Sequence, residues 1–261
     1  MKRFLHDTAK YLEYAKCSAK CTLKSEVADS HLGWLWWILD PLLFMLIYSF
    51  VAVVVFGKGE KYFAAFVFIG YSSWQFFSKT VLQCVRLVTQ NASVVQKVYL
   101  PKHILIFIQM FINGFKLLVS YVLVVGIMAL YRVPVSYNLF FAIPLFVVLG
   151  MVVFGISTFM LHFGVFVDDL YNILNVLLRL LFYLSGVFYN IHKRNIPEPL
   201  ATILLKCNPC AFVMNELRKC MIYQQTPDIL GMIVWFVLGI ILSVAGMKLI
   251  YKYENSYVKV I

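Results

Sequence analysis

The sequence predicts an all-α integral membrane protein with six transmembrane helices, and both its composition and its apolar runs support this. Of the 261 residues, 62% are hydrophobic and 13% are charged, whereas about 25% of the residues in a soluble domain are charged. Mean hydropathy is +0.83. Apolar runs of about 20 residues recur along the chain, and this length crosses a hydrocarbon core about 30 Å thick. The chain has room for about six such spans joined by short loops.

Residues 1–33 predict a cytosolic amphipathic helix that lies along the inner membrane surface. Apolar residues recur at helical spacing from Leu5 to Leu23, and Lys16, Lys20 and Lys24 form a ladder at i, i+4 spacing on another face. The segment lacks the apolar core of a signal peptide. Its lysine ladder either attracts anionic lipids in general or meets a phosphorylated headgroup on its way into the protein.

Residues 34–261 predict a single transmembrane domain. Its six spans are expected at residues 34–56, 62–85, 104–130, 139–167, 170–189 and 229–251. Only Asp168 and Asp169 separate the fourth and fifth spans, which predicts a tight helical hairpin. The opening segment holds six Lys or Arg residues and the first outer loop holds only Lys58 and Lys61, so we expect both termini in the cytosol. The outer loop 190–228 is also basic, but longer loops translocate with less regard for charge.

The net charge of +11 and the cysteines do not indicate a nucleic-acid partner or a metal. Anionic headgroups attract each Lys or Arg near the membrane surface by about 1 kcal/mol, which accounts for a basic membrane protein. Cys207 and Cys210 form a CxxC pair that is either a disulfide or two free thiols, because the further ligands of a zinc site are missing. The histidines are scattered, so the sequence predicts neither a metal site nor an enzyme.

Polar residues recur at helical spacing in three of the predicted spans. These stripes are Gln75, Lys79, Gln83 and Arg86 in the second span, Gln109, Asn113, Lys116 and Ser120 in the third, and Asn172, Asn175, Arg179, Tyr183 and Gly186 in the fifth. A charge facing lipid at mid-membrane costs several kcal/mol, so we expect Lys116 and Arg179 to face protein or a water-filled path. The stripes either join helices by hydrogen bonds or line a polar conduit, and for Arg179 a conduit or an anionic ligand is favoured.

Aromatic residues gather at the start of the first span and within the second. Trp34, Trp36 and Trp37 precede the first apolar run, while Tyr71 and Trp74 lie deeper in the second. Flat rings stack on the C–H faces of sugars, and such a lining holds a sliding glycan at many weak contacts. The alternative for the tryptophans is an interfacial aromatic belt.

The inner loop of residues 88–103 predicts a docking point for a soluble partner. Its segment Ser93–Tyr99 is compatible with a short helix that Pro101 stops. No G-x-x-x-x-G-K-[ST] loop occurs in the chain, so the sequence predicts that any ATP hydrolysis belongs to a partner subunit.

Four short motifs, in order, resemble the permease subunits of ABC-2 type polysaccharide exporters. They are Ser30-x-Leu32-Gly33-x-x-Trp36 followed by Pro41, Gly70 with Trp74, Lys97-Val98-x-x-Pro101-Lys102, and Asn208-Pro209 with Arg218. The resemblance covers nearly the whole chain. It implies a permease in the bacterial cytoplasmic membrane that exports an undecaprenyl-type lipid-linked glycan, either O antigen, capsular polysaccharide or teichoic acid.

The resemblance also implies an assembly and three sets of site residues. It implies a homodimer docked on two copies of an ABC ATPase, which binds the ATP and Mg²⁺, and re-entrant gate helices within the outer loop 190–228. Channel contacts would come from Trp34, Trp37, Tyr48, Tyr71, Trp74, Asn175, Arg179 and Tyr183. The pyrophosphate would meet Lys20, Lys24, Arg86, Lys97, Lys102 and Arg179. The ATPase would contact Ser93, Val94, Val95, Gln96, Lys97, Val98 and Tyr99.

Two departures from the family pattern and three alternatives accompany this interpretation. Asp40 replaces the usual Asn before Pro41, which adds an acid that either pairs with Lys or Arg or modulates the charge preference for the substrate. Asp168-Asp169 replaces an Arg-Asp pair. An ABC-2 permease for drugs or simple lipids would have an apolar cavity in place of the stripes. A secondary transporter would need inverted repeats, and a membrane-embedded enzyme would need His or metal ligands near its acids.

Overall fold

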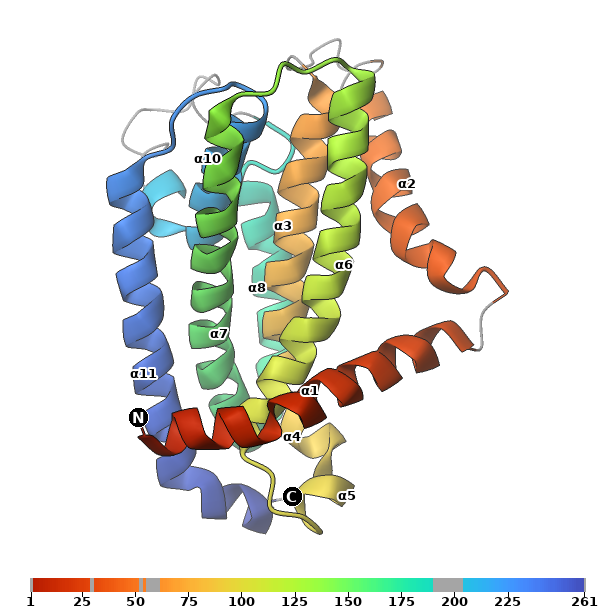
Figure 1. Cartoon of the computed structure of the whole chain (residues 1–261). Helices are drawn as coiled ribbons and strands as arrows, with labels where there is room; N and C mark the ends of the chain where they lie inside the picture. Colours follow the sequence, from red (N-terminus) through yellow and green to blue (C-terminus); the bar gives the residue numbers. More distant parts are fainter. Residues whose placement is uncertain (1, 29–30, 52–53, 55–61, 190–203, 261) are drawn as a thin grey trace.

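The computed structural model describes residues 2–28, 31–51, 54, 62–189 and 204–260, and these residues form helices without any strand. Predicted features at Lys58, Lys61 and residues 190–203 lie outside the described residues. The helices pack as an upright bundle, with one long helix laid across its lower end in the view of Figure 1. The predicted all-helical membrane architecture is therefore confirmed at this level.

The helices follow the predicted order closely. Ahead of the bundle are α1 (Lys2–Ala28) and the 3-10 turn η1 (Gly33–Leu35), and the bundle then comprises α2 (Trp36–Phe50), α3 (Phe63–Cys84), α6 (Lys102–Leu130), η3 (Tyr137–Phe141), α7 (Ala142–Phe166), α8 (Leu170–Leu184), α10 (Pro209–Met221) and α11 (Ile229–Val260). The short helices α4 (Leu87–Gln90) and α5 (Ala92–Val95) lie in the loop between α3 and α6. Three residues separate α7 from α8, as expected of the predicted hairpin.

Four helical segments of the described chain are long and apolar enough to cross a membrane: Gly33–Phe50, Lys102–Leu130, Tyr137–Phe166 and Ile229–Tyr257. Figure 1 shows α3 and α8 running beside them. The described structure is thus that of a multi-pass membrane protein, and the count of six spans stays a prediction.

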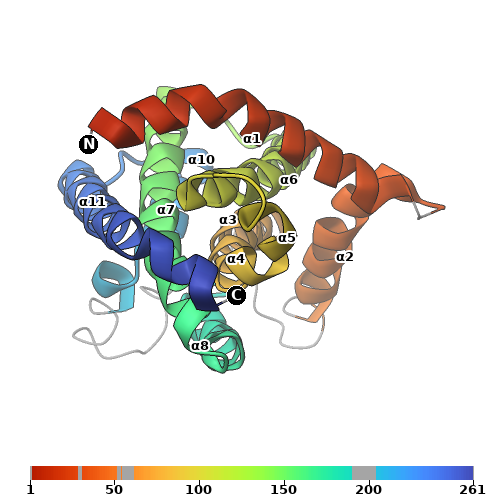
Figure 2. The ribbon, with the colours of Figure 1, turned by 90° about the horizontal axis from the view of Figure 1, so that it is seen from below.

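Helix α3 passes through the centre of the bundle, as the view along its axis shows (Figure 2). Seventeen of its 22 residues are buried, and it packs against α2, α6, α7, α8 and α10. Because protein surrounds α3, it tolerates polar residues that a lipid-facing helix would not carry. This position explains why α3 is less apolar than the four long spans.

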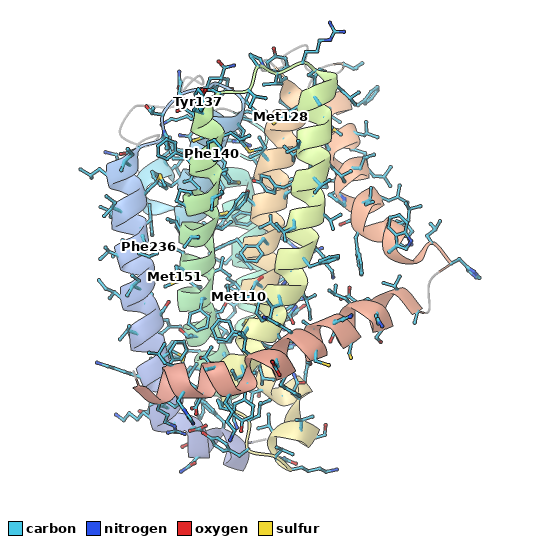
Figure 3. The ribbon with its side chains drawn as sticks, viewed as in Figure 1. Met110, Met128, Tyr137, Phe140, Met151 and Phe236 are labelled. Carbon is cyan, nitrogen blue, oxygen red and sulfur yellow. The ribbon has the colours of Figure 1, made fainter. Side chains whose placement is uncertain are left out.

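The interface between α6 and α7 is filled by flexible apolar side chains. The Met110 side chain of α6 reaches within 4.0 Å of the position that a Cβ on Gly150 of α7 would take (Figure 3). Met151 instead faces α11, since its Cβ lies 3.2 Å from the position that a Cβ on Gly239 would take. Tyr137 and Phe140 lie at the upper end of the bundle, where both are largely exposed. Exposed rings at one end of a bundle are typical of a membrane interface.

Two predicted boundaries are wrong. The fifth span was expected to reach residue 189, but α8 ends at Leu184 because Ser185 donates to the carbonyl of Leu181 and Gly186 takes a left-handed φ of 68°. The short helix expected at Ser93–Tyr99 instead ends at Val95 and starts at Ala92. The residues that follow form turns up to Pro101, because proline disfavours the helical conformation in the residue before it.

Candidate functional site

A groove of about 400 Å³ lies between α2, α3 and α8. It contains five of the eight residues predicted to line a channel. Its lining is Phe44, Tyr71, Trp74, Gln75, Ser78, Lys79, Leu82, Asn175, Leu178, Arg179, Phe182 and Tyr183. The groove therefore brings together residues of the predicted second-span stripe on α3 and of the predicted fifth-span stripe on α8.

Stacked rings hold α2 against the rest of this wall. Phe44 stacks on Tyr71 with ring centroids 3.6 Å apart, and Tyr48 stacks on Phe188 at 3.9 Å. Trp74 is 5% exposed and lies 5.7 Å from the ring of Phe182. Each such pair contributes about 1 kcal/mol beyond its buried area. These rings therefore serve mainly to pack the helices together, and only small parts of Tyr71 and Trp74 border the groove.

Both α3 and α8 supply polar residues to the groove, and those of α8 are the more open. Arg179 is exposed and makes no hydrogen bond or ion pair with any described residue, while Tyr183 is 61% exposed. Asn175 is half-buried beside them. A guanidinium on the flank of a membrane bundle needs a polar partner or water, because lipid does not solvate it.

Trp34 and Trp37, the two channel tryptophans predicted at the start of the first span, lie apart from this groove. Trp34 is 61% exposed in η1, and Trp37 packs edge-on against Phe115 of α6 at 5.4 Å. Tyr48 contacts the rings beside the groove without lining it. The structure thus divides the predicted channel residues into a groove on α3 and α8 and an aromatic group at the start of α2.

The residues predicted to meet pyrophosphate are not gathered in one place. Lys20 and Lys24 are exposed on α1, beside an apolar cavity of about 780 Å³. Arg86 lies over the ring of Tyr171 at 3.8 Å. Lys102 is 2% exposed and donates to the carbonyl of Leu100 at 3.1 Å.

Lys97 is exposed in the loop after α5, at the lower end of the bundle. Of the six predicted residues, only Arg179 borders the groove. A shared phosphate site formed by all six is therefore not present in the described structure.

The loop that holds α4 and α5 carries exposed apolar residues and is tied to both ends of the chain. Val94 is 39% exposed, Val98 is 60% exposed and Tyr99 is 53% exposed. Arg3 of α1 donates to the hydroxyl of Tyr99 and also to Oε2 of Glu254 on α11 at 2.8 Å. Ser93, Val95 and Gln96 complete the predicted docking segment, and Val95 is buried against the bundle. The loop is thus anchored on one side and open on the other.

The hydrogen bond to Tyr99, together with the charge of Glu254, raises the pKa of Arg3. Partial burial raises the pKa of Tyr99, and the hydrogen bond from Arg3 opposes this. The guanidinium and the neutral phenol are therefore the forms that the anchor stabilises.

Arg218 of α10 is a buried cation that holds the upper half of the bundle together. It donates from Nε to the carbonyl of Phe66 at 3.1 Å, from Nη1 to that of Gly186 at 2.9 Å and from Nη2 to that of Val187 at 2.7 Å. A Cβ on Gly70 would lie 2.3 Å from Nη2 of Arg218, so a larger residue there would displace the guanidinium. These motif residues act as one packing unit.

Asn208 and Ser185 form a second link between α10 and the end of α8. Asn208 caps α10 by accepting from the backbone of Cys210 at 3.0 Å, and its Nδ2 donates to the hydroxyl of Ser185 at 2.7 Å. Cys210 is buried and Cys207 is exposed, and both are free thiols. The alternative of two unpaired thiols is the one that the structure contains.

The third-span stripe mainly joins helices. Asn113 donates to the hydroxyl of Thr80 at 3.0 Å and to the side-chain oxygen of Gln83 at 2.9 Å, and Gln109 donates to the same oxygen. Asp40 lies 4.0 Å from Lys79, at the distance limit for an ion pair with a basic residue. No group of three or more potential metal ligands occurs among the described residues.

Sequence reasoning missed three rings beside the groove: Phe44, Phe182 and Phe188. Phe44 was detectable, because it lies one helical turn before Tyr48 and so on the same face of α2. Phe188 had no local signal, since it follows the end of α8 and reaches the site only through the turn at Gly186.

Similar proteins point to the same family as the motifs. No family model matches the chain. The chain is 25% identical over 241 residues to an O-antigen export system permease protein RfbA of Klebsiella pneumoniae, which covers 92% of this chain and 91% of that protein. It is 26% identical over 208 residues to the permease of the same name from Myxococcus xanthus, covering 79% of each. The resemblance of this chain to the permease subunits of ABC-2 type polysaccharide exporters is therefore confirmed over nearly its whole length.

Proposed function

We propose that this protein is the permease subunit of an ABC transporter that exports a lipid-linked polysaccharide, O antigen foremost, across the bacterial cytoplasmic membrane. The similarity to O-antigen export permeases over 92% of the chain supports this function. In this role the chain is a transport subunit and not an enzyme. Helix α1 and the C-terminal end of α11 lie at the same, lower end of the bundle (Figure 1), which supports the proposal that both termini are in the cytosol.

The observation that carries the transport mechanism is the open groove on α3 and α8. Arg179 and Asn175 border it on the flank of the bundle, where lipid would leave the guanidinium without a partner. A second copy of the chain, set against α8, closes the groove into a water-filled passage. We therefore propose a homodimer with the groove of each copy facing the shared passage.

The mixture of rings and amides in the groove suits a glycan better than an apolar drug. Tyr183, which is largely exposed, offers a ring face for the C–H surfaces of sugars, while Asn175 and Gln75 exchange hydrogen bonds with hydroxyl groups. Many weak contacts of this kind let a chain slide without being held at one place.

The energy comes from a separate ATPase, two copies of which dock on the dimer and bind the ATP and Mg²⁺. Val94, Val98 and Tyr99 present exposed apolar surface at the lower end of the bundle, and such a patch is typical of a protein interface. The links from Arg3 to Tyr99 and Glu254 support a path by which movement of this loop reaches α1 and α11.

Helix α10 is proposed as part of an outer gate. Its first turn is linked to Ser185 at the end of α8, and the helix is packed within the bundle against α3 and α7. A short helix held inside the outer half of the bundle is what a re-entrant gate requires.

Transport in proteoliposomes tests this proposal. The permease is co-reconstituted with the ATPase expressed from the same locus and with a lipid-linked O antigen, and ATP-dependent appearance of glycan at the far side is measured. We expect export by the unchanged chain and a loss of about tenfold or more for Arg179→Gln, since a polar contact of the passage is removed.

Arg132→Gln is the matched control, because Arg132 is exposed at the upper end and does not line the groove. Normal export by Arg179→Gln would remove the groove from the mechanism. Absence of ATP-dependent export with every lipid-linked glycan tried would remove the proposed function itself.

A further inference from the structure

A second polar cavity, also of about 400 Å³, lies on the other side of α3, between the last turns of α1 and the facing sides of α2 and α6. Tyr71, Gln75 and Lys79 line both this cavity and the groove, so the two spaces share a wall. None of the roles proposed above uses this cavity.

Two lysines from different helices line the cavity. Lys79 comes from α3 and Lys116 from α6, and both side chains remain partly accessible, at 48% and 28%. Bringing two ammonium groups to one cavity of a membrane bundle costs free energy unless anions compensate them. The two lysines therefore favour the presence of anionic groups in or beside the cavity.

Each lysine has a carboxylate partner from the edge of the bundle. Glu26, near the end of α1, lies 2.7 Å from Nζ of Lys116, and Asp40, which is exposed on α2, lies 4.0 Å from Nζ of Lys79. The second distance is at the limit for an ion pair, and exposed pairs contribute only about 0–1 kcal/mol. Both carboxylates are thus exchangeable for an anion that binds the lysines more strongly.

A buried hydroxyl on the cavity wall also lacks a partner. Ser72 is 3% exposed and lines the cavity, and its Oγ makes no hydrogen bond with any described residue. Leaving a buried hydroxyl unpaired costs about 1–3 kcal/mol, so such a group indicates a missing acceptor or donor. A ligand oxygen in the cavity would satisfy it.

We propose that this cavity binds the phosphate or diphosphate of the lipid-linked substrate, with Lys79 and Lys116 as its cationic ligands and Glu26 and Asp40 as the counterions that the phosphate displaces. This inference rests on the proposed function and names the headgroup site within it. Phosphate oxygens accept charge-assisted hydrogen bonds from ammonium groups, and a diphosphate carries more negative charge than either carboxylate. Ser72 donates to a phosphate oxygen, which gives its hydroxyl a partner.

The exchange of counterions predicts opposite effects for the two kinds of charged residue. Removing a lysine removes a ligand, so the affinity for a diphosphate falls. Removing a carboxylate removes a competitor, so the affinity rises. A merely structural ion pair would behave differently, because loss of either partner would then be equally harmful to the site.

Binding is measured by intrinsic tryptophan fluorescence, since Trp36 and Trp37 line the cavity. The full chain in phosphatidylcholine nanodiscs is titrated with geranylgeranyl diphosphate, and geranylgeraniol serves as the uncharged probe. We expect Lys79→Gln and Lys116→Gln each to weaken diphosphate binding about tenfold, and Asp40→Asn and Glu26→Gln each to strengthen it about threefold. The alcohol should bind all variants alike.

Lys10→Gln is the matched control, because Lys10 is exposed on α1 and is not part of the cavity. Thermal unfolding of each variant detects misfolding, and Lys116→Arg keeps the charge and should retain binding. Weaker binding by all four variants, or unchanged binding by both lysine variants, would overturn the proposal. Equal competition by phosphatidylglycerol would also overturn it, since the cavity would then hold an ordinary anionic lipid.

The result is separable from that of the export assay. Unchanged diphosphate binding by the lysine variants, with normal ATP-driven export by the unchanged chain, would remove the headgroup site and leave the function standing. The opposite-signed binding effects without any export would leave the site and remove the function.

Discussion

At the scale of single residues, the upper half of this protein depends on one arginine. Arg218 satisfies three backbone carbonyls, and two of these belong to the turn that ends α8, at Gly186 and Val187. Backbone carbonyls inside a membrane bundle cannot accept hydrogen bonds from water, so they need a donor within the protein. The planar guanidinium reaches several acceptors at once, which a lysine cannot do.

Arg218→Met is expected to lower the free energy of unfolding by at least about 3 kcal/mol, because it leaves three carbonyls without their donor. Thermal unfolding of the purified protein in detergent measures this loss. Arg179→Met, at an exposed site, is the matched control and should change stability little. Equal stability of the two variants would contradict the assigned role of Arg218.

Gly70→Ala is expected to destabilise the protein by a related route. The added Cβ would lie 2.3 Å from Nη2 of Arg218 and 3.3 Å from the carbonyl of Val187, so the guanidinium must move off its acceptors. Gly126→Ala is the control, since no atom lies within 4 Å of its added Cβ and alanine favours the helix by about 1 kcal/mol. Melting temperatures of the two variants should shift in opposite directions.

At the scale of elements, three segments from distant parts of the chain meet at the lower end of the bundle. Arg3 of α1 links the loop after α5, through Tyr99, to α11, through Glu254. Asp7 extends this cluster by accepting from the hydroxyl of Tyr251 at 3.2 Å. These contacts connect the loop after α5 to both terminal helices.

Tyr99→Phe is expected to cost about 1 kcal/mol of stability through loss of the hydrogen bond from Arg3. Burial in the fold raises the pKa of Tyr99, so its contribution is complete below the ordinary tyrosine pKa of about 10 and is lost as pH rises through the raised value. The difference in melting temperature between wild type and variant should stay constant from about pH 6 to pH 9 and shrink above about pH 10.

Tyr14→Phe, at an exposed residue on α1, provides the control for this pH series. A difference that grows at alkaline pH would show that Tyr99 is ionised in the fold.

Val98→Glu is expected to weaken binding of the ATPase subunit about tenfold or more, because it puts a charge into the exposed apolar patch of the docking loop. Co-purification and the affinity of the two subunits measure this effect. Val135→Glu is the matched control, since Val135 is also an exposed valine, with 79% of its surface exposed, and lies outside the loop, between α6 and η3. Loss of binding in both variants would indicate general misfolding.

At the scale of the whole molecule, helix α8, which borders the groove, is largely uncovered, since only Leu174 and Leu178 of its 15 residues are buried. Val176 and Leu180 are 68% and 55% exposed on its outer face, and Arg179 lies between them. A face that mixes apolar residues with a charge fits neither lipid nor water alone. It fits a second protein chain that leaves room for a polar passage.

Val176→Cys is expected to form disulfide-linked dimers in membranes under mild oxidation, since α8 faces its copy in the proposed dimer. The exposed native thiols Cys17, Cys21 and Cys207 are first replaced by serine. Leu118→Cys on α6, which is similarly exposed at 66%, is the control and should stay monomeric. Cross-linking through α6 and not α8 would place the passage elsewhere.

Much of the helix order could be predicted from the sequence because the apolar run that marks each helix consists of adjacent residues. The hairpin at Asp168 and Asp169 and the stop before Pro101 are properties of a few adjacent residues. The end of α8 was misplaced because Val187 and Phe188 continue the apolar run beyond Ser185 and Gly186. Only contacts with Arg218, 32 positions away from Gly186, show why the backbone turns there.

The candidate site was predictable in part for the same reason. The stripe of α8 correctly grouped Asn175, Arg179 and Tyr183, since residues at helical spacing share a face wherever the helix lies. The predicted headgroup residues were chosen by charge alone, and charge does not say which neighbour a side chain meets. Lys102 is buried against its own loop as a result.

The sequence by itself determined that this protein lies in a membrane, where its helices run and which residues share a helix face. Hydropathy and helical periodicity are properties of neighbouring residues. The tertiary structure alone decided which faces meet. It placed the polar residues of α3 at the centre of the bundle, paired Lys79 with Asp40 and Lys116 with Glu26, and fixed Arg218 on three carbonyls. Such pairings follow from how the chain returns on itself over long separations, which no local pattern encodes.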